Sequence, residues 1–376
     1  MEYSGGGDSP AEHGLGDSVP VRVLEFYSGI GGMRYSLMEA KVNAKVVEAF
    51  DINDVANDVY EYNFGHRPHQ VLLHHLFLCD TFICHERWFL RRETFKTSLP
   101  LILIVTRQTR GFFPLLVNLT LAKVIIKSRR KKLHFSRCIG LKKQSSDARA
   151  SSFTQILELI KHAKHPPRML FVENVVGFET SDTHSQLMEI LKNMNYTVAE
   201  FLLSPLQFGV PYSRPRYFCL AKKNISRSNN KLMNSQIIHS PKVIGLDELT
   251  LTCEPIKMRI ESNEEANYVP YNVIERWGSA MDVVYDDSHR CCCFTKSYYR
   301  YVKGTGSVLA TQKANNLKDM KLRFFSPREV ANLHSFPRSF QFPPHISLKQ
   351  CYALLGNSLS VAVVGPLLRF LFSEEM

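Results

Sequence analysis

The chain has 376 residues, 44% of them hydrophobic and 22% charged, which is typical of a globular protein with one large domain or two of ordinary size. Its net charge of +12 suggests a polyanionic partner, but Val71–Ile139 alone contains 13 of the 47 basic and 3 of the 35 acidic residues. The rest of the chain carries 34 basic and 32 acidic residues, so the net charge is excluded as evidence for a nucleic-acid partner.

Composition also bounds the compartment and the chemistry. Met1–Pro20 is rich in Gly, Ser and Asp and predicts a disordered tail. Nine cysteines without paired spacing, and no secretory leader, predict a reducing intracellular compartment. The apolar run Leu99–Val105 is too short to cross a bilayer, so we predict no membrane segment. Cys291, Cys292 and Cys293 would point to alternating faces of an extended segment, so we predict no metal site.

Strands and helices are predicted to alternate along the first part of the chain. Apolar runs bounded by turn residues predict strands, and apolar residues at helical spacing predict helices. The predicted strands are Val21–Phe26, Lys45–Phe50, Met169–Val172, Thr197–Leu203 and Arg216–Ala221, and the predicted helices are Met33–Ala40, Val55–Tyr62, Phe153–His162 and Ser185–Asn193. The alternation predicts an α/β fold, with an open, mostly parallel sheet and helices on both faces.

The later part of the chain changes character. Residues 224–322 are polar, irregular and poor in clear helices, which predicts an inserted recognition region. Ser326 then caps a predicted helix, with Pro327 at its first position and Glu329 in its first turn. An apolar helix is expected over Leu359–Phe372. We therefore expect a main domain over 21–223, an inserted region over 224–322, and C-terminal helices over 323–376 that return to the main domain.

The first two predicted strands carry a nucleotide-binding arrangement. Gly29, Gly31 and Gly32 follow the first strand, and Asp51 ends the second. Glycine lets the backbone approach a ligand, and the acid can accept two hydrogen bonds from ribose hydroxyls. The spacing does not fit the dinucleotide G-x-G-x-x-G form. A tight turn and a helix cap are the alternative explanations.

Five separate segments, in order, carry a resemblance to a known family. They are Leu24–Gly32, Phe171–Val175 with its Glu-Asn-Val sequence, Gln207–Arg216 with an Arg-x-Arg pair, Phe325–Glu329 with Phe336–Pro337, and Leu355–Val361. Together they resemble the motifs of the cytosine-5 methyltransferases. The resemblance implies a Rossmann-like sheet that binds S-adenosyl-L-methionine, with a smaller inserted target-recognition region.

Within that family the chain is most similar to the branch that methylates the anticodon loop of tRNA, chiefly tRNA-Asp. Cys293–Lys296 followed by Gly304–Ser307 resembles the recognition signature of that branch. The resemblance implies a tRNA partner, a cytoplasmic and nuclear location, and a monomer. DNA is the alternative substrate, because the branch was first classed with DNA methyltransferases.

The resemblance also implies roles for individual residues. A cysteine thiolate adds to C6 of cytosine and makes C5 nucleophilic. Glu173 would bond N3 and the exocyclic amine, and Arg214 and Arg216 would hold the base carbonyl or a nearby phosphate. A helix cap or an ion pair is the alternative for Glu173, and a solvated pair is the alternative for the two arginines.

The cofactor and the substrate base are assigned to further residues by the same resemblance. The implied cofactor-binding residues are Phe26, Ser28, Gly29, Gly31, Gly32, Asp51, Ile52, Asn357 and Ser358, and those implied in substrate recognition are Cys293, Phe294 and Thr295. A simple cap of the last helix is the alternative role for Asn357.

The nucleophilic cysteine itself is missing in frame. The first two codon bases of Gly111–Ala122 are nearly fixed by the genetic code, and moving the frame back by one base lets them encode W-L-L-S-P-P-C-Q-P-Y-T-R. Glu93–Arg110 becomes G-N-I-Q-N-L-T-A-A-D-L-D-R-Y-K-A-D-A in the same frame. The cysteine codon then overlaps those of Leu116 and Val117. Free third bases make coincidence the alternative, but the run restores a Pro-Pro-Cys motif where one is lacking.

Splicing explains the shift. Each suspect segment opens at a valine, whose codon begins with the GT of an intron start, and closes at codons that can supply AG. We hypothesise that Val71–Arg92 and Val124–Ile139 are unspliced intron and that Glu93–Lys123 is an exon in a shifted frame. The central strand leading to the cysteine would then be lost. The chain is expected to keep cofactor-binding elements without methylating, and a catalytically dead protein that binds S-adenosylmethionine or RNA is the alternative of another class.

Overall fold

The computed structural model describes residues 19–70, 101–105, 148–163, 165–224, 236–246, 252–261, 267–374 and 376. Residues 1–18 of the predicted tail and both predicted intron segments lie outside the described residues, as do Leu116 and Val117.

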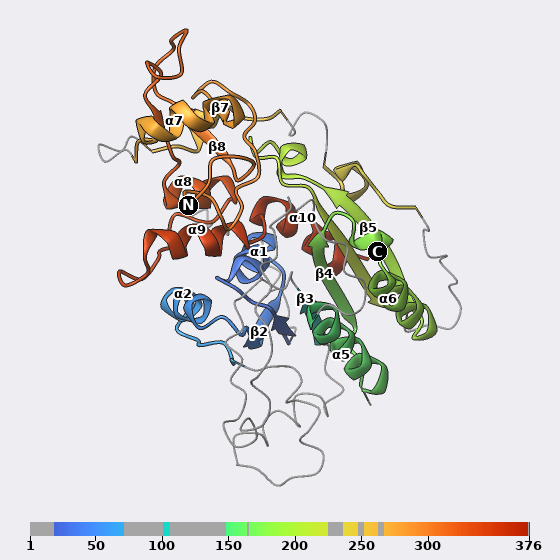
Figure 1. The fold of residues 1–376 in the computed structure, drawn as a ribbon. Helices are drawn as coiled ribbons and strands as arrows, with labels where there is room; N and C mark the ends of the chain where they lie inside the picture. The colour runs from blue at the N-terminus through green and yellow to red at the C-terminus, as the bar shows by residue number, and fades with distance from the viewer. Residues whose placement is uncertain are drawn as a thin grey trace, which may run out of the picture.

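A six-stranded sheet forms the centre of the protein, with the spatial order β2-β1-β3-β4-β6-β5 (Figure 1). Its strands are β1 (Val21–Phe26), β2 (Ala44–Phe50), β3 (Leu101–Val105), β4 (Met169–Val175), β5 (Tyr196–Leu203) and β6 (Arg216–Lys223). The strands β2, β1, β3 and β4 are parallel, whereas β6 is antiparallel to both β4 and β5. The predicted open α/β sheet is confirmed, and an antiparallel edge completes it.

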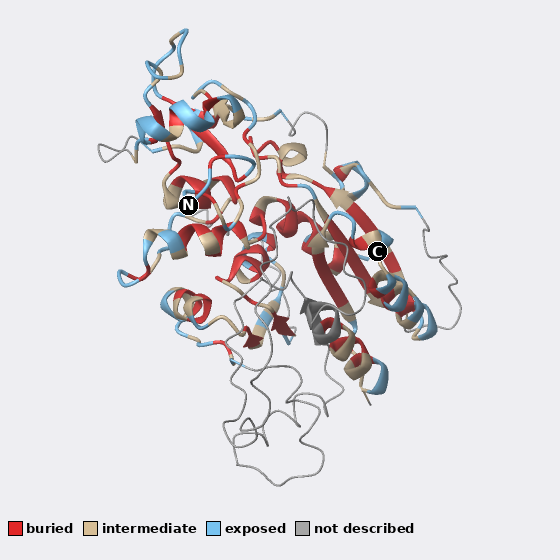
Figure 2. Ribbon diagram, in the orientation of Figure 1, coloured by how far each residue is buried: buried red, intermediate tan, exposed pale blue. Residues whose placement is uncertain are grey.

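Helices cover both faces of this sheet. They are α1 (Gly32–Ala40), α2 (Asp54–Phe64), α5 (Ala148–His162), α6 (Asp182–Asn193) and α10 (Val361–Phe372). Side chains alternate along a strand, so Phe171 of β4 packs in the cluster with α1 and α10, while Leu170 and Val172 pack in the cluster with α5 and α6. Figure 2 shows buried residues along β4 and β6 and on the helices that cover the sheet. A strand that is covered on both faces therefore has an unbroken run of apolar residues in its sequence.

The prediction that the central strand is lost is wrong for residues 101–105. Leu101–Val105 form β3 and pair in parallel with β1 on one side and β4 on the other. Leu103 lies opposite both Leu24 and Leu170. A central parallel strand favours continuous apolar and β-branched residues, which the run Leu-Ile-Leu-Ile-Val supplies. The centre of the sheet is therefore filled, by a run that precedes the site of the missing cysteine.

The C-terminal part holds three helices, of which two were expected. In α8 (Pro327–Leu333), Ser326 and Glu329 form a reciprocal capping box, as predicted. The helix α9 (Leu348–Gly356) was not predicted, and Asn357 lies at its C-cap. The last helix, α10, begins at Val361 and not at Leu359. The alternative role of Asn357 as a cap of the last helix is therefore wrong, because α9 ends there.

The stretch Leu348–Phe372 has the length and composition of a membrane span, with a mean hydropathy of 1.6. Its most apolar window is 72% buried inside the protein. The stretch is divided between α9 and α10, and each helix is shorter than the roughly 20 residues that cross a bilayer. Burial in the core accounts for its apolar character.

The predicted recognition region contains a second, smaller sheet. Its order is β7 (Asp282–Val284), β8 (Ser307–Ala310) and β9 (Leu322–Arg323). The helix α7 (Tyr271–Trp277), which was not predicted, lies beside this sheet in Figure 1. The remaining short 3-10 helices of the described chain are η3 (Phe178–Thr180), η4 (Pro205–Phe208), η5 (Pro241–Ile244), η7 (Ile256–Met258) and η8 (Gly278–Ala280).

Candidate active site

The loop after β1 forms one side of a pocket. Tyr27, Gly29 and Gly31 have φ angles of 57°, 53° and 85°, a left-handed conformation that glycine adopts at little cost. A Cβ atom on Gly31 would lie 2.2 Å from Cε2 of Phe64. Glycine is therefore required at Gly31 both by the turn and by the packing of α2, and the turn leads directly into α1 at Gly32.

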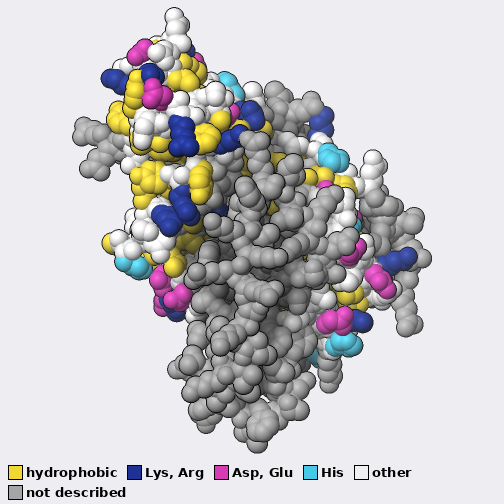
Figure 3. Space-filling view, in the orientation of Figure 1, with side chains coloured by type: hydrophobic (Ala, Val, Ile, Leu, Met, Phe, Trp, Pro, Cys, Tyr) yellow, Lys and Arg dark blue, Asp and Glu magenta, His cyan; other side chains and the backbone are white. Residues whose placement is uncertain are grey.

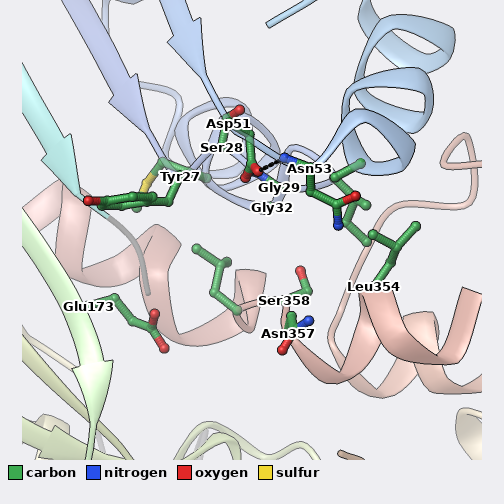
Figure 4. A pocket seen from close by; sticks show the side chains of 14 residues that line it. Tyr27, Ser28, Gly29, Gly32, Asp51, Asn53, Glu173, Leu354, Asn357 and Ser358 are labelled. Atoms are coloured by element: carbon green, nitrogen blue, oxygen red, sulfur yellow. Dashed lines mark hydrogen bonds between the residues drawn. The ribbon is translucent and has the colours of Figure 1, made fainter. Parts of the chain in front are cut away.

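Asp51 lies at the end of β2 with its carboxylate fixed in this pocket (Figure 4). Its Oδ2 accepts a hydrogen bond from the backbone N–H of Gly29, and its Oδ1 accepts one from the N–H of Asn53, each at 2.8 Å. Burial raises the pKa of Asp51, and these backbone bonds oppose the rise. A carboxylate has about four acceptor positions, so the two bonds orient the group and leave capacity for the hydroxyls of a ligand.

The pocket joins the loop after β1 to the segment between α9 and α10. It encloses about 450 Å³ of space, including space open to solvent. The lining residues are Tyr27, Ser28, Gly29, Ile30, Gly32, Met33, Asp51, Asn53, Ala56, Glu173, Leu354, Asn357, Ser358 and Leu359. A Cβ atom on Gly32 would lie 3.2 Å from Oγ of Ser358. The absence of a side chain there lets the two segments meet.

Glu173 brings an acid from β4 to the opposite wall of the same pocket (Figure 4). It is 4% exposed, and its Oε1 lies 3.3 Å from Nε of Arg216, at the start of the neighbouring strand β6. Burial and the positive charge of Arg214 lower the pKa of Arg216, and Glu173 opposes this. The structure thus places a buried carboxylate and its guanidinium partner at one end of the pocket.

Arg214 has a different environment from Arg216. Its side chain is 2% exposed, and its Nη1 donates to the Tyr212 hydroxyl, to Sγ of Cys293 and to the carbonyl of Phe294, at 3.5, 3.3 and 3.4 Å. Its Nη2 donates to the carbonyls of Gly356, at 3.2 Å, and of Ser358. Both terminal nitrogens are therefore engaged by protein acceptors. The solvated arginine pair considered as an alternative is wrong, because Arg214 is buried and the side chain of Arg216 is only 11% exposed and paired with Glu173.

The predicted recognition residues serve partly as an anchor. The ring of Phe294 is 1% exposed and packs against Tyr212, Tyr298 and Phe325, so it cannot contact a substrate. The backbone N–H of Thr295 donates to the carbonyl of Thr305 at 2.9 Å.

Cys293 carries the most unusual thiol of the region. Burial tends to raise the pKa of Cys293, but the positive charges of Arg214 and Arg216 and the bond from Arg214 lower it below its usual value. The neighbouring Cys291 is fully buried, and its Sγ donates to the carbonyl of Pro211. Within the described ranges there is no group of three or more His, Cys, Asp or Glu side chains that could hold a metal ion.

Most of the predicted cofactor residues meet in the pocket. Those that line it are Ser28, Gly29, Gly32, Asp51, Asn357 and Ser358. Three others do not: Phe26 stacks on Phe50 with the ring centroids 4.8 Å apart, Gly31 packs on Phe64, and the carbonyl of Ile52 accepts a bond from Gln70.

Several lining residues were not predicted from the sequence. Tyr27, Ile30 and Met33 flank the glycines, and Asn53 follows Asp51 by two residues, so proximity to the motif was an available signal. Leu354 belongs to α9, which was itself not predicted, and only the folded chain brings it to the pocket.

Comparison with known proteins gives one family. The family model described as C-5 cytosine-specific DNA methylase matches residues 134–372. The tRNA (cytosine(38)-C(5))-methyltransferase of Homo sapiens is 31% identical over 425 aligned positions, covering 94% of this chain and 99% of that protein. The DNA (cytosine-5)-methyltransferase of Dictyostelium discoideum is 33% identical, covering 94% and 95%.

Solved structures give the same result. The crystal structure of the S. pombe Dnmt2 methyltransferase matches with a TM-score of 0.71 and 29% identity, covering 93% of this chain and 98% of that one. The Dnmt2 mutant structure from Spodoptera frugiperda also matches with a TM-score of 0.71, at 28% identity.

Proposed function

Since this chain belongs to the C-5 cytosine-specific methyltransferase family, we propose that its gene encodes a tRNA cytosine-5 methyltransferase and that the chain as it stands is a non-catalytic form of it. The proposed substrate is cytosine in the anticodon loop of tRNA, chiefly tRNA-Asp. We further propose that the protein is a monomer in cytoplasm and nucleus.

The cofactor of this family, S-adenosyl-L-methionine, fits the residues of the pocket. Asp51 keeps acceptor capacity for ribose hydroxyls, and Gly29 and Gly32 allow close approach of a ligand to the backbone. The hydroxyl of Ser28 lines the pocket, is buried, and has no hydrogen-bond partner among the described residues. When bound, S-adenosyl-L-methionine supplies an electrophilic methyl group carried on a sulfonium.

One observation supports base methylation above all. Glu173 lines the same pocket as Asp51 and Asn357, and Arg216 forms an ion pair with it. A carboxyl group there can bond N3 and the exocyclic amine of a cytosine, and Arg216 holds that group in place. The target base has to leave its stack to reach such a pocket, which costs less in a loop than in a duplex.

The missing nucleophile supports the non-catalytic state of this chain. No Pro-Pro-Cys sequence occurs in frame, and valine at 117 has no nucleophilic group. The family-model match begins at residue 134, near the end of the suspect region, whereas the relatives align along 94% of the chain. This pattern agrees with a segment whose sequence differs from the family, lying between two segments whose sequences resemble the family.

An RNA substrate is supported by the recognition region. From Arg290 to Lys321 the chain has seven basic residues and one acidic residue, and all seven basic side chains are exposed. Figure 3 shows Lys and Arg side chains among hydrophobic ones over this region. Tyr299 and Tyr301 are 40% and 59% exposed, and exposed aromatic rings beside basic residues suit unpaired bases and phosphates. DNA is the second candidate, because the relative from Dictyostelium discoideum is named as a DNA methyltransferase.

Two measurements test the proposal. Sequencing the transcript across the codons for residues 70–140 should show that the codons for Val71–Arg92 and Val124–Ile139 are removed in the mature message. Transfer of labelled methyl groups to tRNA and to duplex DNA should then be measured for the chain as it stands and for the frame-corrected chain. We expect transfer to tRNA by the corrected chain only.

The other outcomes separate the alternatives. Activity on duplex DNA but not on tRNA would show that the gene encodes a DNA methyltransferase instead. Activity of the uncorrected chain would refute its non-catalytic state. If both segments persist in abundant message and the chain binds S-adenosylmethionine without transferring a methyl group, a binding protein replaces the enzyme as the product.

A further inference from the structure

We infer that Arg214 is a positioning residue, which holds the pocket segment Gly356–Leu359 against the recognition segment Cys293–Lys296 and does not contact the substrate base. Tyr212 and His334 complete this unit. The inference rests on the proposed function for the nature of the ligand, S-adenosylmethionine, while the contacts themselves belong to this chain.

Arg214 holds the pocket segment through two of its carbonyl groups. Its Nη2 donates to Gly356 and Ser358, which flank Asn357. Asn357, Ser358 and Leu359 line the pocket, so the guanidinium fixes the backbone from which these side chains project. Arg214 is charged and only 2% exposed. Hydrogen bonds from such a buried charged donor are stronger than bonds between neutral groups in water.

The same side chain holds the recognition segment. Its Nη1 donates to Sγ of Cys293 and to the carbonyl of Phe294. The two segments also touch directly, because a Cβ atom on Gly356 would lie 2.3 Å from the backbone N of Lys296. Recognition region and cofactor pocket are therefore in backbone contact at Gly356, with Arg214 bonded to both sides of that contact.

Tyr212 and His334 hold the pocket segment from a second direction. The Nδ1 atom of His334 lies 2.9 Å from the carbonyl oxygen of Leu359, which can only accept, so Nδ1 carries the proton. Burial, and then the charge of Arg214, hold the pKa of His334 well below its usual range, so the ring is neutral and Nε2 is an acceptor. Nε2 then accepts from the Tyr212 hydroxyl at 3.1 Å, and that oxygen accepts from Arg214. All three side chains are at most 2% exposed.

Arg216 supplies the contrast within the same motif. Its Nε lies 3.3 Å from Glu173, and its Nη1 donates to the carbonyl of Pro215. No bond from Arg216 to the pocket segment is present among the described residues. The two arginines therefore have different roles. Arg216 pairs with Glu173, whereas Arg214 holds the backbone of the pocket segment.

Binding of S-adenosylmethionine to the full chain, measured by calorimetry, tests whether Arg214 positions the pocket segment. Arg214→Gln should weaken binding by about tenfold or more, because a charge-assisted clamp on the pocket segment is lost. The control Arg338→Gln, at an exposed position outside the pocket, should stay within about twofold of the unchanged protein. Tyr212→Phe should weaken binding about threefold, and Tyr217→Phe, which removes a buried hydroxyl on the other face of the sheet, should not. His334→Asn, which can still donate to Leu359, should bind better than His334→Leu.

A second readout follows the thiol of Cys293. Its alkylation rate against pH, measured by peptide mass spectrometry, should have a higher midpoint in Arg214→Gln than in the unchanged chain. If Arg214→Gln fails to fold, Tyr212→Phe against Tyr217→Phe decides the inference through binding. Equal weakening by the two arginine variants, or unchanged binding in Arg214→Gln, would overturn it. If the unchanged chain binds no S-adenosylmethionine, the cofactor part of the proposed function fails. In that case the alkylation of Cys293 still tests the inference, because an equal pH midpoint in Arg214→Gln and in the unchanged chain would refute the role of Arg214.

Discussion

Glu173 and Arg216 form an ion pair between neighbouring antiparallel strands, with Oε1 and Nε 3.3 Å apart. Glu173 pairs with Phe218 in the β4–β6 register, so the two partners of the ion pair are not directly opposite. The side chains of Glu173 and Arg216 are 4% and 11% exposed, so both charges are largely removed from water and each stabilises the other. This geometry explains how an acid can remain in place on the wall of the pocket.

Loss of the Glu173 charge should abolish catalysis in the frame-corrected protein. We expect Glu173→Gln to lower kcat by about 10²–10⁴-fold, which is the usual contribution of a positioned acid or base. Turnover on tRNA, measured with saturating cofactor, is the test. Glu189→Gln, on the exposed face of α6, is the control and should leave kcat unchanged. A Glu173→Gln enzyme with normal kcat would remove this residue from the mechanism.

Asp51 should determine cofactor affinity. Asp51→Asn retains the size of the side chain but replaces one acceptor by a donor, next to the N–H groups of Gly29 and Asn53. We expect the Kd for S-adenosylmethionine to rise about tenfold or more. Asp54→Asn, whose side chain is 60% exposed, is the matched control and should bind normally. Equal affinities for the two variants would contradict the role assigned to Asp51.

Two glycines in left-handed conformations should respond differently to alanine. Gly31→Ala combines an unfavourable φ of 85° with a clash against Phe64, and should lower the free energy of unfolding by about 2–4 kcal/mol. Gly65→Ala has a φ of 63° with no atom within 4 Å, so only the backbone cost of about 1 kcal/mol applies. Urea unfolding of both variants measures the difference. Equal losses would show that Phe64 moves aside freely.

Glu25 should make the stability of the protein depend on pH. Its carboxyl is fully buried and accepts a bond from Tyr60 at 2.9 Å, and burial raises the pKa of Glu25 to about 8. Between its ordinary value of 4.5 and about 8, the folded state holds a proton that the unfolded state has lost. The free energy of unfolding therefore falls as pH rises through this window, by at most about 1.4 kcal/mol per pH unit.

Glu25→Gln should remove that contribution, because glutamine has no titrating group. Urea unfolding at pH 5.5 and 7.5 should show a smaller decrease for Glu25→Gln than for the unchanged protein. Glu39→Gln, at an exposed position on α1, should retain the original decrease. A decrease of the same size in all three proteins would place the titrating group elsewhere.

Local sequence determined the motifs of this protein and many of its elements. The strand Val21–Phe26 was predicted at its exact bounds, because an apolar run and a glycine turn are signals within a few residues. The capping box at Ser326 and Glu329 was also local, since its two partners are three residues apart. The hypothesis of a frame shift around Gly111 rests on the sequence alone, because it concerns codons and not contacts.

Tertiary structure decided what those motifs do together. The run Leu101–Val105 occupies the centre of the sheet because its apolar residues suit a strand covered on both faces, whereas the other frame would encode Ala-Asp-Leu-Asp-Arg there. Arg214 and Arg216 are equivalent in the sequence, yet one bonds Gly356 and Ser358, about 140 residues away, and the other bonds Glu173. Such partners depend on which segments pack together, and packing over long sequence separation leaves no local pattern from which to predict it.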